Sequence, residues 1–293
     1  MTVELEHSAS RPLPRGALLA NSLQAITLLA GFASLLAAIL WPQLGQGAVV
    51  VAVLAAIAIG TLAARLPPAT VMRIYGARPY EAGDLAQFDG ITTELARRAG
   101  LRSPPRLYVV PSMLLSTFSV GSSQNFATAL TEGLLRRLTM REVAAVLARE
   151  VAHAKRGDLF VFAIADLISR CAQGLFYIGL ALAAMNLLAS ISGGERMPWL
   201  SIGLMFLAPA LMNLLQLVLS RSREFDTDRA AALLTGDPLG IASAISRLDA
   251  QPGAPVDDLT PPVPARKVGL PSMLRLSTEV DRRVARVTEF QAP

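Results

Sequence analysis

Long stretches without a charged residue constrain this chain more than any other feature of its sequence. Residues 17–40 and 47–64 form two such stretches near the N-terminus, and residues 171–194 and 197–220 form two more in the second half. A helix needs about 20 predominantly apolar residues to cross the hydrocarbon core of a membrane. We therefore predict a mainly α-helical, polytopic membrane protein whose four transmembrane helices form two hairpins.

The composition agrees with a membrane protein and argues against other classes. The mean hydropathy is +0.46 and only 17% of the residues are charged, which is unusual for a soluble domain of this length. The net charge of +5 could indicate nucleic-acid binding, but only 5% of the residues are aromatic, so few side chains could stack on bases. We expect membrane lipid as a partner and no nucleic acid. Because Cys171 is the only cysteine, an internal disulfide is excluded.

The arginines predict how the spans are oriented. They flank the outer ends of both hairpins, whereas the loops inside the hairpins carry almost none; the flanking residues are Arg11, Arg15, Arg65, Arg73, Arg78, Arg221 and Arg223. Positively charged residues are enriched in the cytoplasmic loops of membrane proteins. We therefore expect a bacterial-type inner (plasma) membrane protein whose large soluble segment faces the cytoplasm.

The chain divides into six predicted regions. These are a cytoplasmic N-terminus (1–16), a transmembrane hairpin (17–64), a cytoplasmic core (65–158), a second transmembrane pair (159–220), a helical region (221–250), and a Pro-rich loop with a C-terminal helix (251–293). Within the soluble parts, periodicity predicts helices at 80–100, 139–156 and 274–290 and strands at 106–110, 116–120 and 125–130. The cytoplasmic regions should therefore form a small α+β domain.

One predicted helix carries the residues with the most chemical meaning. Thr139 and Glu142 have the spacing of a capping box that opens this helix, and Gly157 is placed to end it. Inside it lies the sequence Arg149-Glu150-Val151-Ala152-His153. A zinc-peptidase helix carries H-E-x-x-H, because two histidines four apart share one face and grip a metal, and the Glu acts on the metal-bound water. Alone, R-E-x-x-H more often marks an ordinary solvated or partly buried helix face.

The surroundings of this motif resemble those of a known family. Residues 138–158 read L-T-M-R-E-V-A-A-V-L-A-R-E-V-A-H-A-K-R-G-D, and residues 220–228, after the last span, read S-R-S-R-E-F-D-T-D. Apart from Arg149, both segments are similar to the core of the HtpX-like membrane zinc metallopeptidases, which are integral membrane zincin endopeptidases. The two pairs of spans have the same order, so the resemblance covers nearly the whole chain.

The resemblance implies a role for several residues and a zinc cofactor. Glu150 would be the general base, and His153 and Glu224 would be metal ligands. Asp228 and Asp158 would be partners behind the ligands, with Asp228 orienting His153. The strand at 125–130, with Asn125, Ala127 and Ala129, would offer an edge to an extended substrate. The implied activity is metal-dependent proteolysis of misfolded membrane proteins, in a zincin-like fold.

This chain departs from the family pattern in three places. Arg149 stands at the first ligand position, although a guanidinium is permanently cationic and offers only donors. Ser116 stands where many relatives have Asn, and residues 275–279 lack the His-Pro-Pro found in relatives. His7 is the only other histidine. We hypothesise that Arg149 bridges Glu150 and Glu224 and so replaces the charge of the metal; the alternative is that Arg149 extends into solvent.

Three functions are compatible with these residues. The first is a working zinc endopeptidase in the proteolytic quality control of membrane proteins. The second is an inactive pseudoprotease that binds extended or misfolded membrane polypeptides without cutting them. The third is a structural or assembly protein that keeps only the fold. The chemistry of Arg149 favours the second over the first.

Overall fold

A computed structural model describes most of the chain. It covers residues 15–80, 86–192, 197–249 and 277–289, without the side chains of residues 15–18, 86, 87, 220–224, 249 and 277–281. The chain forms two compact units. Among the described residues, the membrane unit contains residues 20–65, 161–192 and 197–220, and the soluble unit contains residues 15–19, 66–80, 86–160, 221–249 and 277–289.

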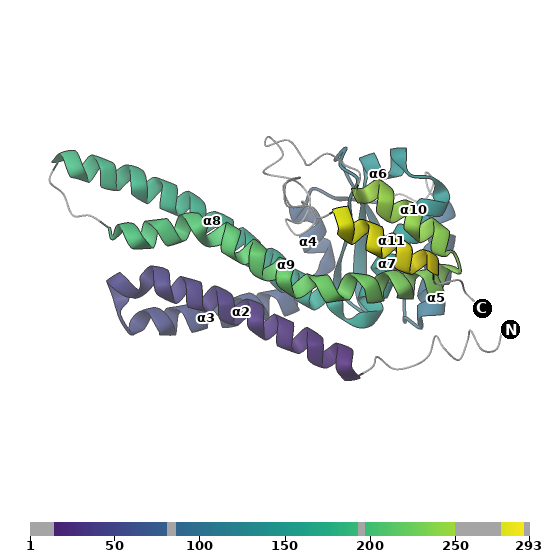
Figure 1. Ribbon diagram of the computed structural model, residues 1–293, viewed down its shortest axis with the longest axis horizontal. Coiled ribbons are helices and arrows are strands. Elements are labelled where there is room, and N and C mark those ends of the chain that lie inside the picture. Colours follow the sequence, from purple (N-terminus) through teal and green to yellow (C-terminus); the bar gives the residue numbers. More distant parts are fainter. Residues whose placement is uncertain (1–14, 81–85, 193–196, 250–276, 290–293) are drawn as a thin grey trace. The chain divides into compact units, whose positions relative to one another are not determined.

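The membrane unit confirms the predicted spans. Four helices contain stretches long and apolar enough to cross a membrane: α2 (Arg15–Leu44), α3 (Gly47–Arg65), α8 (Asp158–Ser192) and α9 (Trp199–Thr235). Two of them are longer than the predicted spans. The helix α8 includes residues 158–170 together with the apolar stretch, and α9 continues without a break past residue 220 (Figure 1).

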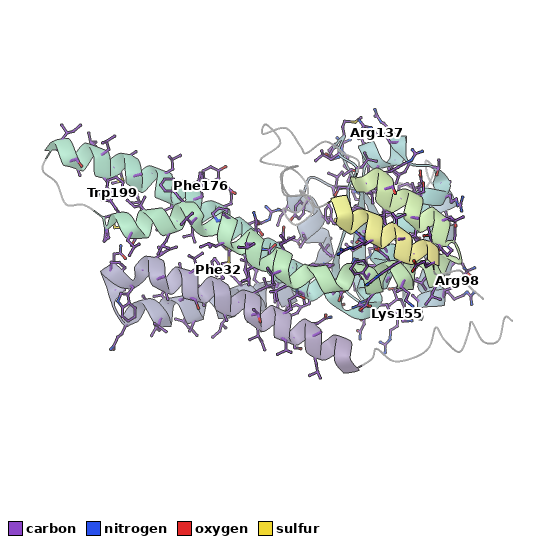
Figure 2. All side chains as sticks on the ribbon, in the orientation of Figure 1. Phe32, Arg98, Arg137, Lys155, Phe176 and Trp199 are labelled. Carbon is purple, nitrogen blue, oxygen red and sulfur yellow. The ribbon has the colours of Figure 1, made fainter. Side chains whose placement is uncertain are left out.

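Apolar side chains from all four of these helices form the core of the membrane unit, with Ile59 as the buried contribution of α3. Leu28, Phe32 and Ile39 of α2 are buried together with Ile164 and Ile168 of α8, and α9 contributes Met205 and Met212. Trp199, labelled with Phe32 in Figure 2, is exposed, as is Trp41 near the end of α2. Exposed tryptophans at the ends of spans are typical of membrane interfaces.

The soluble unit is built around a four-stranded sheet. The strands are β1 (Arg78–Pro79), β2 (Arg106–Val110), β3 (Thr117–Ser122) and β4 (Asn125–Thr131), in the order β1-β2-β4-β3. The described residues of this unit also include the part of α9 from residue 221 and the helices α4 (Pro68–Ile74), α5 (Ala86–Ala99), α6 (Glu132–Arg137), α7 (Met140–Arg156), α10 (Pro238–Asp249) and α11 (Ser277–Glu289) (Figure 1). The α+β character predicted for the soluble domain is therefore confirmed.

The position of β4 corrects one prediction. This strand pairs in parallel with β2 and antiparallel with β3, so that Ala127 lies opposite both Arg106 and Val120. The prediction that Asn125, Ala127 and Ala129 present a free edge to a substrate is therefore wrong. The tight turn after Ser122 folds β3 outside β4. Within the sheet of described residues, β1 and β3 are the two end strands, and β3 packs against α7.

The helix α7 begins and ends as predicted. The Thr139 hydroxyl accepts a hydrogen bond from the Glu142 amide, and the Glu142 carboxylate accepts one from the Thr139 amide at 2.8 Å. Gly157 closes the helix in the left-handed conformation with a φ of 74°. Glu142 also accepts hydrogen bonds from Ser243 at 2.6 Å and pairs with Arg247 at 2.9 Å, which ties α10 to the start of α7.

Acid should weaken the contact between α7 and α10 that Glu142 makes. Burial alone raises the pKa of Glu142, but the hydrogen bonds from Ser243 and Thr139 and the charge of Arg247 outweigh burial, so its pKa lies below the usual 4.5. The folded chain then binds fewer protons than the unfolded chain, so this stabilisation is complete above about pH 4.5 and is lost as the pH falls through the lowered pKa.

We expect Glu142→Gln to lower the free energy of unfolding by about 1–3 kcal/mol at pH 7 and to flatten the loss of stability below pH 4.5. Melting temperatures of both proteins between about pH 3 and 7 test this. Ser243→Ala removes one hydrogen bond to Glu142, so it should reduce the dependence of the melting temperature on pH by a smaller amount. An unchanged acid slope in Glu142→Gln would contradict the assignment.

Candidate functional site

The motif residues lie on α7 inside the soluble unit. Glu150 and His153 are buried, and the side chain of Arg149 is only 15% exposed. Most of α7 between Glu142 and Ala154 is buried, so this helix passes through the core rather than lying on the surface. A titratable cluster in such a place is unusual, because burying charge is costly unless the charges are paired.

His153 is held by a buried carboxylate. The turn at Gly157 brings Asp158, the first residue of α8, back toward α7, and its Oδ2 lies 3.0 Å from His153 Nδ1. Asp158 is fully buried and also lies 3.5 Å from Nε of Arg156. An ionised carboxylate accepts a hydrogen bond from a protonated ring nitrogen, so Asp158 fixes the orientation of the imidazole. Metal-ligating histidines in proteins are commonly held by a carboxylate in this way.

Arg149 is paired with Asp228 on α9. Its Nε lies 2.8 Å from Asp228 Oδ1, and the Asp228 side chain is only 1% exposed. The same carboxylate is bound by Arg283 of α11, whose Nε lies 2.7 Å from Oδ2 and whose Nη2 lies 3.0 Å from Oδ1. Two guanidinium groups thus share one buried carboxylate, and this cluster joins α7, α9 and α11.

The structure pairs Arg149 with Asp228 and His153 with Asp158, and it places five of the residues discussed for the site in the same unit. Arg149, Glu150, His153, Asp158 and Asp228 all belong to the soluble unit. The side chain of Glu224, one helical turn before Asp228 on α9, lies outside the described residues, and so does the hypothesised contact of Glu224 with the arginine.

The contacts of these residues differ from the expected ones in two respects. His153 contacts Asp158, whereas Asp228, predicted to orient His153, contacts the two arginines. The alternative that Arg149 extends into solvent is wrong, because its side chain is largely buried and ion-paired.

The donor chemistry of the described residues does not fit a zinc ion. The guanidinium of Arg149 has no lone pair to give, and Asp228 already binds two guanidiniums. Among the described residues, which leave out the Glu224 side chain, no group of three or more His, Cys, Asp or Glu side chains is placed to hold a metal. His153 is held by Asp158, and the guanidinium of Arg149 occupies the position at which the family resemblance predicts the first ligand.

Sequence reasoning missed Arg283. This residue lies on α11, far from the motif in sequence, among other arginines of a helix with alternating charges. Nothing in the local pattern distinguishes it from Arg282 or Arg286. The guanidinium of Arg286 lies 4.4 Å from the centre of the Phe225 ring on α9, which gives α11 a second contact with the same helix.

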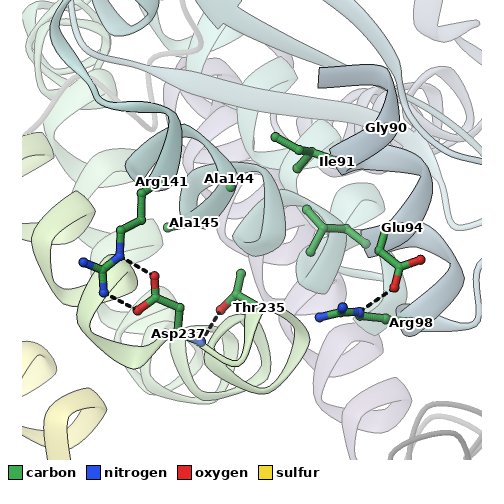
Figure 3. A pocket seen from close by; sticks show the side chains of 10 residues that line it. Gly90, Ile91, Glu94, Arg98, Arg141, Ala144, Ala145, Thr235 and Asp237 are labelled. Carbon is green, nitrogen blue, oxygen red and sulfur yellow. Dashed lines mark hydrogen bonds and ion pairs between the residues drawn. The ribbon is translucent and has the colours of Figure 1, made fainter. Parts of the chain in front are cut away.

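The soluble unit also has a cleft of about 370 Å³ beside the first half of α7 (Figure 3). Ala144 and Ala145 of α7 line it, and charged side chains surround it. Arg141 pairs with Asp237 at 2.5 Å, and Arg98 pairs with Glu94 at 2.7 Å. These charged groups are engaged with one another, and the motif residues do not line the cleft. We therefore assign the candidate site to Arg149, Glu150 and His153 and not to this cleft.

Comparisons with known proteins agree with this assignment. The model of peptidase family M48 matches residues 84–262. A "Protease HtpX homolog" of Methylibium petroleiphilum is 30% identical over 78% of this chain and 79% of its own length. A "Protease HtpX homolog" of Sulfurovum sp. is 32% identical over 70% of this chain and 72% of its own length. A "Protease HtpX" of Legionella pneumophila is 31% identical over 78% of this chain and 81% of its own length.

The family model covers both the motif and the second transmembrane pair. The peptidases of family M48 are zinc metalloproteases, so the family supports zinc as its cofactor, whereas the donors described in this chain do not fit zinc. The four apolar helices agree with an integral membrane protein. The chain belongs to peptidase family M48, as an HtpX-like integral membrane member of that family.

Proposed function

We propose that this protein is a metallopeptidase scaffold that binds extended segments of membrane polypeptides without zinc-dependent cleavage. The observation that carries the proposal is the ion pair between Arg149 and Asp228, at 2.8 Å, in the position of the first metal ligand. Its relatives are named as proteases. In the family pattern, zinc-dependent proteolysis depends on a metal ligand at the position that Arg149 occupies in this chain.

Electrostatics oppose a divalent metal at this site. A cation held beside a guanidinium in a largely dry interior is repelled by several kcal/mol, in addition to the lost ligand. The same guanidinium satisfies the buried Asp228 carboxylate without any metal. Arg149 can therefore link α7 to α9, a linkage that a metal would otherwise provide through ligands on both helices.

The strand β3 is the surface that we propose for polypeptide binding. It lies at one end of the sheet of described residues and packs against α7, the helix that carries the motif. End strands bind extended peptides through main-chain hydrogen bonds, with little demand on the sequence of the peptide. This mode suits a protein that recognises misfolded chains and needs no catalytic group for recognition.

We further propose that the protein lies in a bacterial-type inner membrane with the soluble unit in the cytoplasm. The exposed arginines Arg65, Arg73 and Arg78 follow the second span and support this orientation. Segments of membrane proteins that protrude into the cytoplasm would then be the polypeptides within reach of β3.

Zinc stoichiometry of the full-length protein in detergent tests the proposal. We expect no bound zinc and no casein cleavage in the parent, and one bound zinc with measurable cleavage in Arg149→His. The matched control is Arg141→His, which makes the same replacement two turns earlier on α7, where Arg141 pairs with Asp237. A parent that holds one zinc and cleaves casein would overturn the proposal.

Peptide binding separates the pseudoprotease from a purely structural protein. We expect a fluorescent, unfolded apolar peptide to bind the parent, and we expect the same peptide N-methylated at alternate residues to bind much more weakly, because it cannot extend the sheet. Fluorescence anisotropy measures both. Equal binding of the two peptides, or no binding of either, would contradict the assignment of β3.

A further inference from the structure

We infer that the outer face of α4, with the start of β1, is a binding surface for the headgroups of anionic phospholipids. This surface, called the α4 surface below, consists of Thr70, Arg73, Ile74 and Arg78. All four residues belong to the soluble unit, and all four are exposed. The inference depends on the membrane spans and not on whether the chain cleaves polypeptides.

The inner face of α4 is anchored in the core of the soluble unit. Met72 is completely buried and Tyr75, directly after the helix, is 2% exposed, and both belong to one apolar cluster with Phe118 of β3. The ring centroids of Tyr75 and Phe118 lie 4.9 Å apart. Residues 70, 73 and 74 have the spacing of one helical face, opposite to these anchors. Packing on the sheet therefore determines which face of α4 is available to a partner.

A tight turn holds Arg78 close to the end of α4. The amide of Gly76 donates to the carbonyl of Arg73, and the amide of Ala77 donates to that of Met72, both at 2.9 Å. Gly76 has a φ of 64°, so these two bonds form a Schellman motif, which ends the helix and turns the chain into β1. Arg73 and Arg78 thus lie on either side of one structured turn.

The α4 surface is positively charged without a counter-charge. From residue 65 to residue 80 the sequence has three arginines and no Asp or Glu. Among the described residues, the side chains of Arg73 and Arg78 have neither an ion pair nor a hydrogen bond, whereas Arg98 and Arg141 of the same unit are paired with carboxylates. Guanidinium groups bind phosphate oxygens through charge-assisted hydrogen bonds. The chemistry of this surface therefore suits a phosphate-bearing anion.

The covalent chain keeps this surface near a membrane. The second span, α3, ends at Arg65, and α4 begins at Pro68. Because consecutive Cα atoms are about 3.8 Å apart, the first residue of α4 lies within about 11 Å of the end of the span. The headgroup region is itself about 5–8 Å thick, and the potential of anionic headgroups acts over about 8 Å more. An anionic phospholipid is thus the phosphate-bearing partner that connectivity places beside α4.

The exposed isoleucine of this surface fits the same partner. Ile74 is 60% exposed and adjoins Arg73 in the sequence. A single exposed aliphatic side chain is ordinary on a soluble protein, but beside a membrane it can enter the boundary between headgroups and acyl chains. Arginine and isoleucine on one face give the surface both kinds of contact that a lipid headgroup layer offers.

A dye on the α4 surface tests the inference in the full-length protein. Thr70→Cys is combined with Cys171→Ser, which removes the native cysteine, and is labelled with the environment-sensitive dye NBD. The protein is placed in nanodiscs of phosphatidylcholine alone, or of equimolar phosphatidylcholine and phosphatidylglycerol. We expect brighter emission and stronger protection from acrylamide in the anionic nanodiscs, because contact with headgroups removes the dye from water. Raising the salt concentration to about 1 M should abolish the difference between the lipids.

Substitution of the two arginines should remove this preference. We expect Arg73→Gln and Arg78→Gln each to lower the ratio of membrane-bound to free α4 surface about fivefold in the anionic nanodiscs, and about 25-fold together. The matched control is Arg137→Gln, an exposed arginine on α6 of the same unit, labelled in Figure 2, which should change nothing. Lysine at both positions keeps the charge, so it should retain most of the preference.

Three results would overturn the inference. Equal protection of the dye in the two kinds of nanodisc would show that the surface does not select anionic lipid. An equal loss with Arg137→Gln would show that only the net charge of the soluble unit matters. Loss of protection on adding glycerol 1-phosphate, at the concentration of the anionic lipid, would assign the surface to a free phosphate compound instead of a membrane.

Discussion

Asp228→Asn is expected to lower the free energy of unfolding of the soluble unit by about 3–5 kcal/mol. Asp228 is almost completely buried, and the two guanidiniums that bind it, of Arg149 and Arg283, are each only 15% exposed. The amide keeps the shape of the side chain but removes the charge. Two largely buried cations then remain close together without their shared counter-ion, which is the costly way of breaking a buried ion pair.

Asp226→Asn is the matched control for this prediction. Asp226 lies on the same helix and pairs with Arg156 at 3.3 Å, but its side chain is 66% exposed, so its loss should cost less than about 1 kcal/mol. Scanning calorimetry of the three proteins in detergent measures both effects. Joint replacement of Arg149, Asp228 and Arg283 by apolar residues should recover much of the lost stability. Equal melting temperatures for Asp228→Asn and Asp226→Asn would show that the cluster contributes nothing.

Gly133→Ala should be the next most harmful substitution, with a loss of about 3 kcal/mol. Gly133 lies in the first turn of α6, and its amide donates a hydrogen bond to the carbonyl of Ser112 at 2.9 Å. A Cβ at this position would collide with the backbone carbonyl group of Met113. Backbone atoms cannot turn aside as a side chain can, so the segment that leads into β3 would have to move. Peptide binding at β3 should weaken together with stability.

At Gly90, we expect the same replacement by alanine to raise stability instead of lowering it. Gly90 lies within α5, and a Cβ there meets no atom within 4 Å. Alanine should therefore stabilise the helix by about 0.5–1 kcal/mol, because glycine is the more flexible residue in the unfolded chain. Urea unfolding of both variants tests the pair. A loss of stability in Gly90→Ala, or none in Gly133→Ala, would contradict the packing described here.

The features that could be predicted from the sequence are those with short-range causes. The spans follow from uncharged length, and the capping box of Thr139 and Glu142 follows from a spacing of three residues. Gly157 ends α7 because glycine adopts a positive φ at little cost. The predicted end of the last span at residue 220 does not coincide with a helix end, since charged residues mark the membrane boundary but do not interrupt a helix.

The features that could not be predicted depend on contacts between distant segments. The place of β4 inside the sheet depends on its parallel pairing with β2, which no local alternation reveals. The pairing of Arg149 with Asp228 and Arg283 joins three helices that are far apart in the sequence. The hypothesis drawn from the motif named Glu150 and Glu224 as the partners of Arg149 and did not include Asp228.

The arginine at position 149 has a consequence for when and where the protein can mature. A peptidase that depends on zinc is complete only after it has acquired an ion from its surroundings, so its yield depends on the metal supply of the cell. Here the cation that contacts Asp228 is part of the polypeptide itself. The soluble unit should therefore reach the same folded state in zinc-starved and zinc-replete cells, and in a chelator its melting temperature should not change.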